Sequence, residues 1–293
     1  MLEGKAEYDY LTGQRRESFA AIFERYAQEC AKALNWPDLK LHQRYGEHQR
    51  CVYDFFPPRV DLKHLGTVVY LHAGYWQSRD KSQFHWLGPT LANLGWGVVF
   101  ANYPLCPEVS VKEIVEAIKP LLPALKKANV TQTGLPTILV GHSAGAHLAV
   151  ELGLAAAPFD EHHIDAVLAI SGVYDLSPLI HTTLNVNLKL DDETARQVSP
   201  LHRIDIIEAV KVANSVKSDQ GVHGENPPQL TYALAPALFV VGQAETQAFI
   251  DQNQKMCDAW QKGGGLAHVQ IVPHADHFTI LNHFSYLLDR MAI

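Results

Sequence analysis

A single serine between two glycines most constrains what this 293-residue chain can fold into. Residues 137–140 are apolar or β-branched and are typical of a buried strand. Gly141, Ser143 and Gly145 then form a G-x-S-x-G corner, and residues 146–153 continue with small and apolar side chains at helical spacing. At such a corner the serine is strained, and a Cβ atom on either glycine would collide with nearby backbone. The stretch therefore predicts a strand, a tight turn and a helix that present Ser143 as a nucleophile.

The composition predicts a globular protein, and the partner that we expect for it is a small-molecule substrate. The chain is 47% hydrophobic and 19% charged, which is enough to bury a large core as one α/β domain. A net charge of −7 argues against nucleic acid or an anionic membrane as the main partner. The polar N-terminus lacks an apolar targeting segment, and no run reaches the ~18 apolar residues of a membrane span. We therefore expect an unprocessed cytoplasmic protein.

The positions of the cysteines also fit a cytoplasmic protein. They lie far apart in the sequence without a C-x-x-C pair: Cys30, Cys51, Cys106 and Cys257. This usage favours reduced thiols over a disulfide framework. It leaves the oligomeric state open between a monomer and a homodimer.

Strand and helix patterns alternate along most of the chain. Strands are expected at 49–56, 67–71, 97–101, 137–140, 166–170, 237–242 and 268–272. Helices are expected at 15–34, 82–94, 111–127, 144–153 and 249–262, with a further helix closing the chain. This alternation predicts an α/β fold with a mostly parallel sheet and helices on both faces. Residues 1–293 would form one domain, with a helical arm at 1–45 and a cap insertion at about 177–232.

The loop after the strand at 67–71 reads His-Ala-Gly-Tyr-Trp. Backbone N–H groups in such a loop can bind the negative oxygen of a tetrahedral intermediate, together with the N–H group that follows the nucleophile. The expected donors of this oxyanion hole are Gly74, Tyr75 and Ala144. His72 is expected to hold the loop in place rather than to take part in chemistry.

The chain order of three polar residues matches the Ser, acid, His order of the α/β-hydrolases. Ser143 is followed by Glu245 after the penultimate strand and by His277 after the last strand. In this triad Ser143 would attack an acyl carbon and His277 would move its proton. Glu245 would fix the tautomer of the imidazole and stabilise its protonated form.

Alternatives exist for two of these positions. Asp175, after an earlier strand, could serve as the acid, and His274 could replace His277 as the base. Asp276 is expected to cap its own loop. The histidines of this region match no zinc pattern, so we do not expect them to bind a metal: His268, His274, His277 and His283.

Aromatic residues near the predicted catalytic groups suit an aryl substrate. Trp76, Tyr103 and Phe278 are the expected substrate-binding residues. Tyr103 and Phe278 are equally consistent with the core. No arginine stands out as a clamp for a substrate carboxylate.

Together these motifs resemble the arylformamidase (kynurenine formamidase) branch of the α/β-hydrolases. The likeness runs from about residue 45 to the C-terminus and is carried by four motifs: His-x-Gly-Tyr-Trp, Gly-His-Ser-Ala-Gly-Ala-His-Leu, Ser-Gly-Val-Tyr-Asp-Leu-Ser-Pro-Leu and His-x-Asp-His-Phe. It implies a cytosolic serine hydrolase that removes formate from N-formyl-L-kynurenine in tryptophan breakdown without a cofactor. The triad of the family falls on Ser143, Glu245 and His277.

This chain departs from the family pattern at three places. Ala73 stands where the family usually has glycine, Glu245 stands where an aspartate is common, and the polar stretch from residue 202 to 229 is long. Two further functions therefore remain open. One is a short-acyl carboxylesterase, and the other is a ligand-binding protein of hydrolase fold that has lost catalysis.

Overall fold

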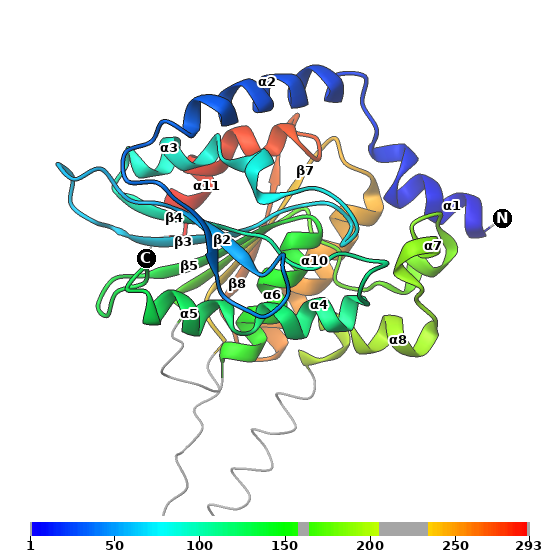
Figure 1. The fold of residues 1–293 in the computed structure, drawn as a ribbon. Coiled ribbons are helices and arrows are strands. Elements are labelled where there is room, and N and C mark those ends of the chain that lie inside the picture. The colour runs from blue at the N-terminus through cyan, green and yellow to red at the C-terminus, as the bar shows by residue number, and fades with distance from the viewer. Residues whose placement is uncertain (1, 158–163, 205–233, 292–293) are drawn as a thin grey trace, which may run out of the picture.

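The protein is built around one eight-stranded sheet, seen in a computed structural model that describes residues 2–157, 164–204 and 234–291 (Figure 1). The strands, with the labels of Figure 1, are β1 (Lys40–Arg44), β2 (Val52–Phe56), β3 (Gly66–Leu71), β4 (Trp96–Ala101), β5 (Thr137–His142), β6 (Ala166–Ile170), β7 (Ala237–Gly242) and β8 (Ala267–Val272). Their order across the sheet is β1-β2-β4-β3-β5-β6-β7-β8. The pairs β1/β2 and β2/β4 are antiparallel, and every other pair is parallel. This is the predicted mostly parallel sheet.

The parallel strands are apolar along their length because both faces of the sheet are covered. In β3, Val69 and Leu71 point into one hydrophobic core, whereas Val68 and Tyr70 point into the other. A strand buried on both sides needs apolar side chains at every position, which explains the uninterrupted run at 67–71.

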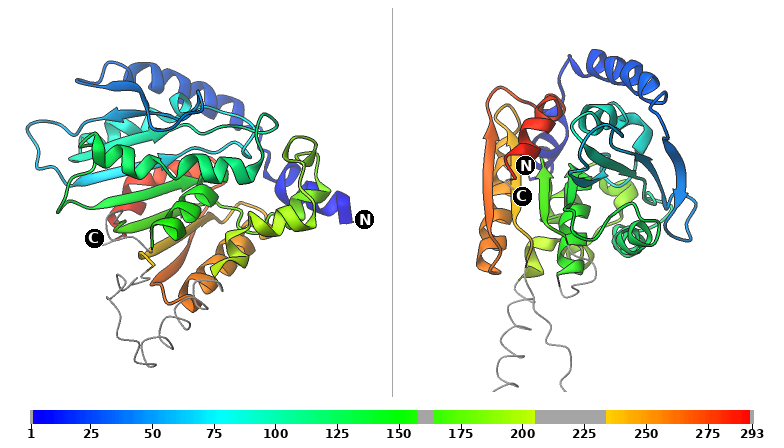
Figure 2. Two further views of the ribbon diagram at one scale, coloured as in Figure 1. Left: turned by 60° about the horizontal axis from the view of Figure 1, so that its bottom comes forward. Right: turned by 90° about the vertical axis from the view of Figure 1, so that its left-hand side faces the viewer.

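Helices lie on both sides of the sheet (Figures 1 and 2). One face carries α4 (Val111–Ile118), α5 (Leu121–Lys127), α6 (Ala144–Ala156) and α10 (Gln247–Lys262). The other carries α2 (Phe19–Ala33), α3 (Leu87–Ala92) and α11 (Phe284–Asp289). The other α-helices among the described residues are α1 (Leu2–Tyr10), α7 (Asn185–Leu188) and α8 (Asp192–Gln197). In the described part of the chain, no helix has the length and apolar character needed to cross a membrane.

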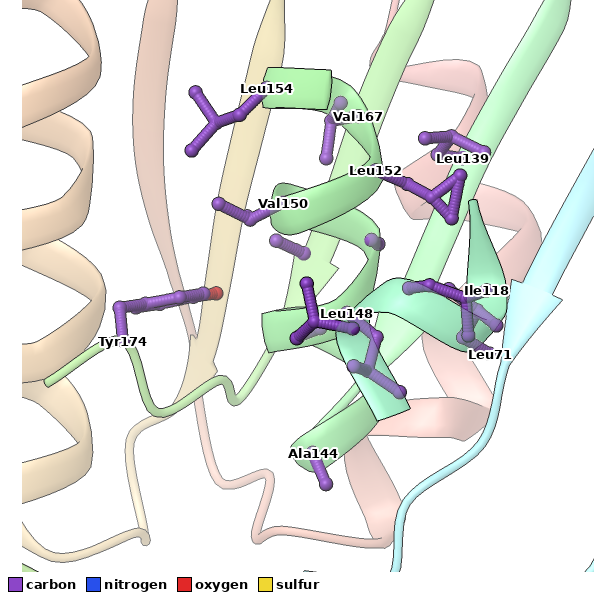
Figure 3. Packing of buried hydrophobic residues seen from close by; sticks show 14 of the residues in the cluster. Leu71, Ile118, Leu139, Ala144, Leu148, Val150, Leu152, Leu154, Val167 and Tyr174 are labelled. Carbon is purple, nitrogen blue, oxygen red and sulfur yellow. The ribbon is translucent and has the colours of Figure 1, made fainter. Parts of the chain in front are cut away.

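Helix α6 is buried on all sides. Its side chains pack against Leu71, Leu139 and Val167 from three successive parallel strands, and against Ile118 of α4 (Figure 3). A helix without a solvent face has no polar stripe, and apart from His147 and Glu151, which are themselves buried, the residues of α6 are small or apolar. This burial fixes the position of the residue that precedes the helix, which is Ser143.

Two predicted helices are each broken into two pieces. The stretch at 111–127 forms α4 and α5, because Pro120 has no N–H group to donate to a carbonyl one turn earlier. The stretch at 82–94 forms a 3₁₀ turn, η2 (Lys81–Phe84), followed by α3. The side chain of Asp80 caps η2 by accepting a hydrogen bond from the Ser82 N–H group.

The ends of the predicted arm and cap also differ from expectation. Residues 40–44 are not part of a helical arm but form β1, an edge strand whose five residues are all exposed. The missing buried face explains why no alternation was visible in the sequence. Of the predicted cap, residues 177–204 contain the short helices η4 (Ser177–His181), α7, α8 and η5 (Pro200–His202). Residues 205–232 lie outside the described part.

A buried ion pair ties β2 to the segment that leads into α3. Lys81 Nζ lies 2.7 Å from Asp54 Oδ2, and His85 Nε2 lies 2.8 Å from the same oxygen. The backbone N–H of His42 donates to the other oxygen, Oδ1, at 2.6 Å. Burial alone would raise the pKa of the Asp54 carboxyl, but these hydrogen bonds outweigh it and lower the pKa.

We predict that Asp54→Asn lowers the free energy of unfolding by about 3–5 kcal/mol at pH 7, because it leaves the Lys81 ammonium buried without a counter-charge. Since folding lowers the pKa of Asp54, this contribution is complete at neutral pH and is lost as the pH falls through the folded-state value. Urea unfolding measures it. Asp61→Asn, which breaks an exposed pair with Arg59, is the matched control and should change stability little. Equal effects of the two substitutions would contradict the prediction.

Candidate active site

Ser143 sits at a strained corner between β5 and α6. Its φ and ψ are 58° and −121°. A Cβ atom on Gly141 would lie 2.0 Å from the carbonyl oxygen of Gly145, and one on Gly145 would lie 2.0 Å from that of Leu71. The Ser143 N–H donates to the Ile170 carbonyl at 2.8 Å. Both glycines are therefore required by the close approach of backbone that the G-x-S-x-G motif predicts.

The side chains of Glu245 and His277 meet at the ends of β7 and β8. His277 Nδ1 donates to Glu245 Oε2 at 2.7 Å. The other oxygen, Oε1, accepts from the Gly242 N–H at 2.8 Å and from the Ser171 hydroxyl at 2.5 Å. The Glu245 carboxylate is fully buried, and a buried carboxylate must be hydrogen-bonded on both oxygens to stay charged. Its three donors meet this need.

The alternative acid and base lie elsewhere. Asp175 is partly exposed, accepts from the Ser177 N–H at 3.0 Å and faces His202 across 3.5 Å. His274 is an exposed residue whose N–H faces the side chain of Gln243. Asp276 caps its loop as predicted, accepting from the N–H groups of Phe278 and Thr279. The pairing of acid with base thus favours Glu245 with His277.

His142 connects the nucleophile corner to the histidine loop. Its Nε2 donates to the His277 carbonyl at 2.7 Å, and the two rings lie 4.9 Å apart between centroids. Burial lowers the pKa of His142 well below its ordinary value, so the ring is neutral and keeps a single N–H for this bond. Within the described residues Ser143 makes no hydrogen bond to the His277 ring. In enzymes without bound substrate, the distance between the nucleophile and its base is often too long for a hydrogen bond and shortens when substrate binds.

The loop that follows β3 has an unusual backbone. Gly74, Tyr75 and Trp76 all have positive φ, at 139°, 49° and 59°. Neither the Tyr75 N–H nor the Ala144 N–H donates a hydrogen bond within the described part of the chain. Ala73 is not among the residues with positive φ, so the methyl group that replaces the usual glycine hydrogen there costs no strain.

His72 holds this loop, as predicted. Its Nδ1 donates to the Ala73 carbonyl at 2.7 Å, and the Tyr103 hydroxyl donates to the His72 carbonyl at 2.7 Å. The rings of His72 and Tyr103 stack 4.3 Å apart. Burial lowers the pKa of His72 to about 4, so the ring is neutral at physiological pH.

The three aromatic residues expected to contact substrate are all buried. Trp76 is fully buried and donates from Nε1 to His147 Nδ1 at 3.2 Å, and Tyr103 is also fully buried. Phe278 packs edge-on against Phe23 of α2, with ring centroids 4.7 Å apart. Substrate contact by Trp76, Tyr103 and Phe278 stays a prediction, while their packing shows that they help to shape the loops around the site.

Residues that sequence reasoning missed come from the start of the chain. The Tyr75 hydroxyl donates to the Tyr10 carbonyl, so α1 supports the loop after β3. Thr246, next to the acid, donates from its hydroxyl to the Asp9 carbonyl at 2.6 Å. The side chain of Gln14 donates to the Thr246 hydroxyl at 3.0 Å. Only the fold brings these segments together, so no local pattern could reveal them.

Within the described residues, no group of three or more His, Cys, Asp or Glu side chains is arranged to hold a metal ion. Two of the histidines weighed above as metal ligands lie in different surroundings: His268 is exposed on β8, and His277 is paired with Glu245.

A comparison with known protein families shows which family has this fold. The α/β hydrolase fold family matches residues 68–281, which is most of the chain and includes Ser143, Glu245 and His277. The chain belongs to the α/β hydrolase family. It is therefore a hydrolase, and its eight-stranded, mostly parallel sheet agrees with the α/β hydrolase fold.

Comparison with individual proteins shows which branch of the family this α/β hydrolase resembles. It is 26% identical to the kynurenine formamidase of Danio rerio over 254 residues, which cover 85% of this chain and 79% of that protein. It is 26% identical to the kynurenine formamidase of Drosophila melanogaster, over 82% of this chain and 75% of that protein. The resemblance to the arylformamidase branch is thereby confirmed.

Solved structures agree on the fold of the hydrolase. A candidate thioesterase from a Silicibacter species has a TM-score of 0.77 and 28% identity, over 96% of this chain and 95% of that one. An esterase from Pyrobaculum calidifontis has a TM-score of 0.65 and 17% identity, over 99% of this chain and 96% of that one.

The buried His72 ring should make folding pH-dependent. In the unfolded chain a histidine binds a proton below its ordinary pKa near 6.5, whereas folded His72 does so only near 4. His72 therefore lowers the free energy of unfolding by about 2 kcal/mol as the pH falls from 7 to 5. We predict that His72→Phe, which keeps an aromatic ring in the stack, removes this dependence. Chemical denaturation of both proteins at the two pH values gives the difference, and equal losses on acidification would contradict the prediction.

Proposed function

We propose that this α/β hydrolase is a serine hydrolase that removes a small acyl group from an aryl amide, with N-formyl-L-kynurenine as its substrate. One observation carries the proposal. A buried carboxylate, Glu245, holds His277 by a 2.7 Å hydrogen bond, and His142 ties His277 to the corner that presents Ser143. The identity to kynurenine formamidases over most of the chain supports the choice of substrate.

The proposed first half-reaction forms a formyl-enzyme. Ser143 Oγ attacks the formyl carbon while His277 Nε2 accepts the hydroxyl proton. The carbonyl oxygen becomes an oxyanion, which the N–H groups of Gly74, Tyr75 and Ala144 would bind. The C–N bond then breaks, and His277 returns the proton to the aryl nitrogen, so that L-kynurenine leaves as the free amine.

The second half-reaction releases formate. Water loses a proton to His277 and attacks the formyl carbon, and the C–O bond to Ser143 breaks as the serine regains a proton. In both halves the imidazole carries a positive charge that the Glu245 carboxylate stabilises. Because Ser171 and the Gly242 N–H hold the opposite oxygen of Glu245, the carboxylate cannot rotate away from His277.

The proposed reaction belongs to tryptophan breakdown, and we place it in the cytoplasm. All four cysteines are buried free thiols, which is consistent with a reducing compartment. A second candidate function, a short-acyl carboxylesterase, is favoured by the esterases among the structures of similar fold. The same residues would carry it out, with an alcohol in place of the amine as the leaving group.

Substrate preference separates these two functions. We predict that kcat/KM for N-formyl-L-kynurenine exceeds that for a p-nitrophenyl short-chain ester by tenfold or more, which corresponds to ~1.4 kcal/mol of transition-state binding. Ser143→Ala should lower both rates by a factor on the order of 10⁶ without changing the circular dichroism spectrum. Turnover of the ester alone would favour the carboxylesterase, and full activity in Ser143→Ala would exclude a serine mechanism.

The identity of the acid is tested separately. Glu245→Gln keeps the shape of the side chain but cannot hold the required imidazole tautomer, so kcat should fall on the order of 10³- to 10⁴-fold. Asp175→Asn is the matched control because its side chain faces Ser177 and His202. It should retain wild-type kcat. The reverse result would assign the acid to Asp175.

A further inference from the structure

A cavity of about 310 Å³ lies between α2 and the segment at 79–85. Helix α2 crosses one side of the molecule, over the face of the sheet that carries α3 and α11 (Figure 1). The apolar part of the cavity wall comes from this helix and from Phe84, and it includes Phe23, Tyr26, Ala27 and Cys30. A volume of this size matches the lower end of the range for small-molecule sites.

The only cation that lines this cavity is Arg79, which has no carboxylate partner in the described part of the chain. Its guanidinium carbon lies 4.3 Å from the ring centre of Phe23 and 5.1 Å from that of Phe278. The acid next to it in sequence, Asp80, is engaged elsewhere and accepts from Ser82 and Asn102. The planar cation thus lies against an edge-to-face pair of aromatic rings, and within the described residues its N–H groups remain available to donate.

An arginine in this setting favours one kind of ligand. A guanidinium group binds a carboxylate through two parallel hydrogen bonds, and it does so more strongly in a partly desolvated pocket than in water. The aromatic and aliphatic wall opposite would accept an apolar body. We propose that this cavity is a binding site for small organic carboxylates with an aryl or alkyl body, with Arg79 as the anchor of the carboxylate.

This site is separate from the catalytic residues and does not depend on the proposed function. Phe278 stands between the two, because its ring contacts Arg79 and Phe23 as well as the rings of His142 and His277. Neither Ser143 nor Glu245 lines the cavity. The ligand would therefore bind beside the histidine loop without touching the nucleophile.

The test uses two probes that differ only in charge. Isothermal titration calorimetry measures the binding of 3-phenylpropanoate and of the neutral 3-phenylpropanamide to the full-length protein at pH 7. We expect the carboxylate to bind at least tenfold more tightly than the amide. Arg79→Gln should reduce its affinity to that of the amide. The control Arg25→Gln removes another arginine that stacks on an aromatic ring of α2 but does not line the cavity, and it should leave both affinities unchanged.

A second variant keeps the test valid if Arg79→Gln is unstable. Ala27→Trp places a large ring in the cavity from an exposed position on α2 and should abolish binding of both probes. Equal affinities of the two probes for the wild-type protein would overturn the proposal. So would carboxylate binding that survives either Arg79→Gln or Ala27→Trp, or no binding at millimolar concentrations.

Discussion

The direct packing of the first turn of α6 on the ends of β3 and β5 is the constraint on which the rest of the site depends. At Gly145 there is no room for a Cβ atom against the Leu71 carbonyl, so helix and strand touch backbone to backbone. That approach places the N–H of Ala144 beside the loop that leaves β3, which carries Gly74 and Tyr75. One packing contact therefore sets both the strained serine and the geometry of the candidate oxyanion hole. The core around α6 maintains the contact because the helix is buried on every side.

A second constraint is the burial of the Glu245 carboxylate. A charge removed from water needs several well-placed donors, and they come from three different strand ends: Ser171 after β6, Gly242 at the end of β7 and His277 after β8. Their convergence follows from the parallel order of these strands, whose carboxyl ends meet at one edge of the sheet. The N-terminal segment then holds the neighbouring Thr246 through Asp9 and Gln14. The start of the chain thus supports a site formed by its end.

Local pattern was sufficient to predict the parallel strands and the serine corner. It succeeded there because both signals lie within short stretches, the apolar run of a doubly covered strand and the glycines of a tight turn. It could not predict β1, whose exposed residues carry no alternation, or the role of Ser171, whose partner is 74 residues away. His142 is a similar case, because it is joined to the histidine loop by a hydrogen bond to the carbonyl of a residue 135 positions later. Such roles are properties of the sheet order and not of sequence spacing.

Lys81 and Arg79 are two cations on the same segment, and the fold stabilises their charges in different ways. Lys81 is almost completely buried and is paired with Asp54, because an ammonium group without a counter-charge would destabilise the interior. Arg79, two residues earlier, is only partly buried and lies on aromatic rings in place of a carboxylate. An arginine that served stability alone would gain from an acidic partner, and Asp80 is close enough in sequence to have supplied one. Its carboxylate is instead used to cap η2, so within the described residues Arg79 has no carboxylate partner and its N–H groups are left for a ligand or water.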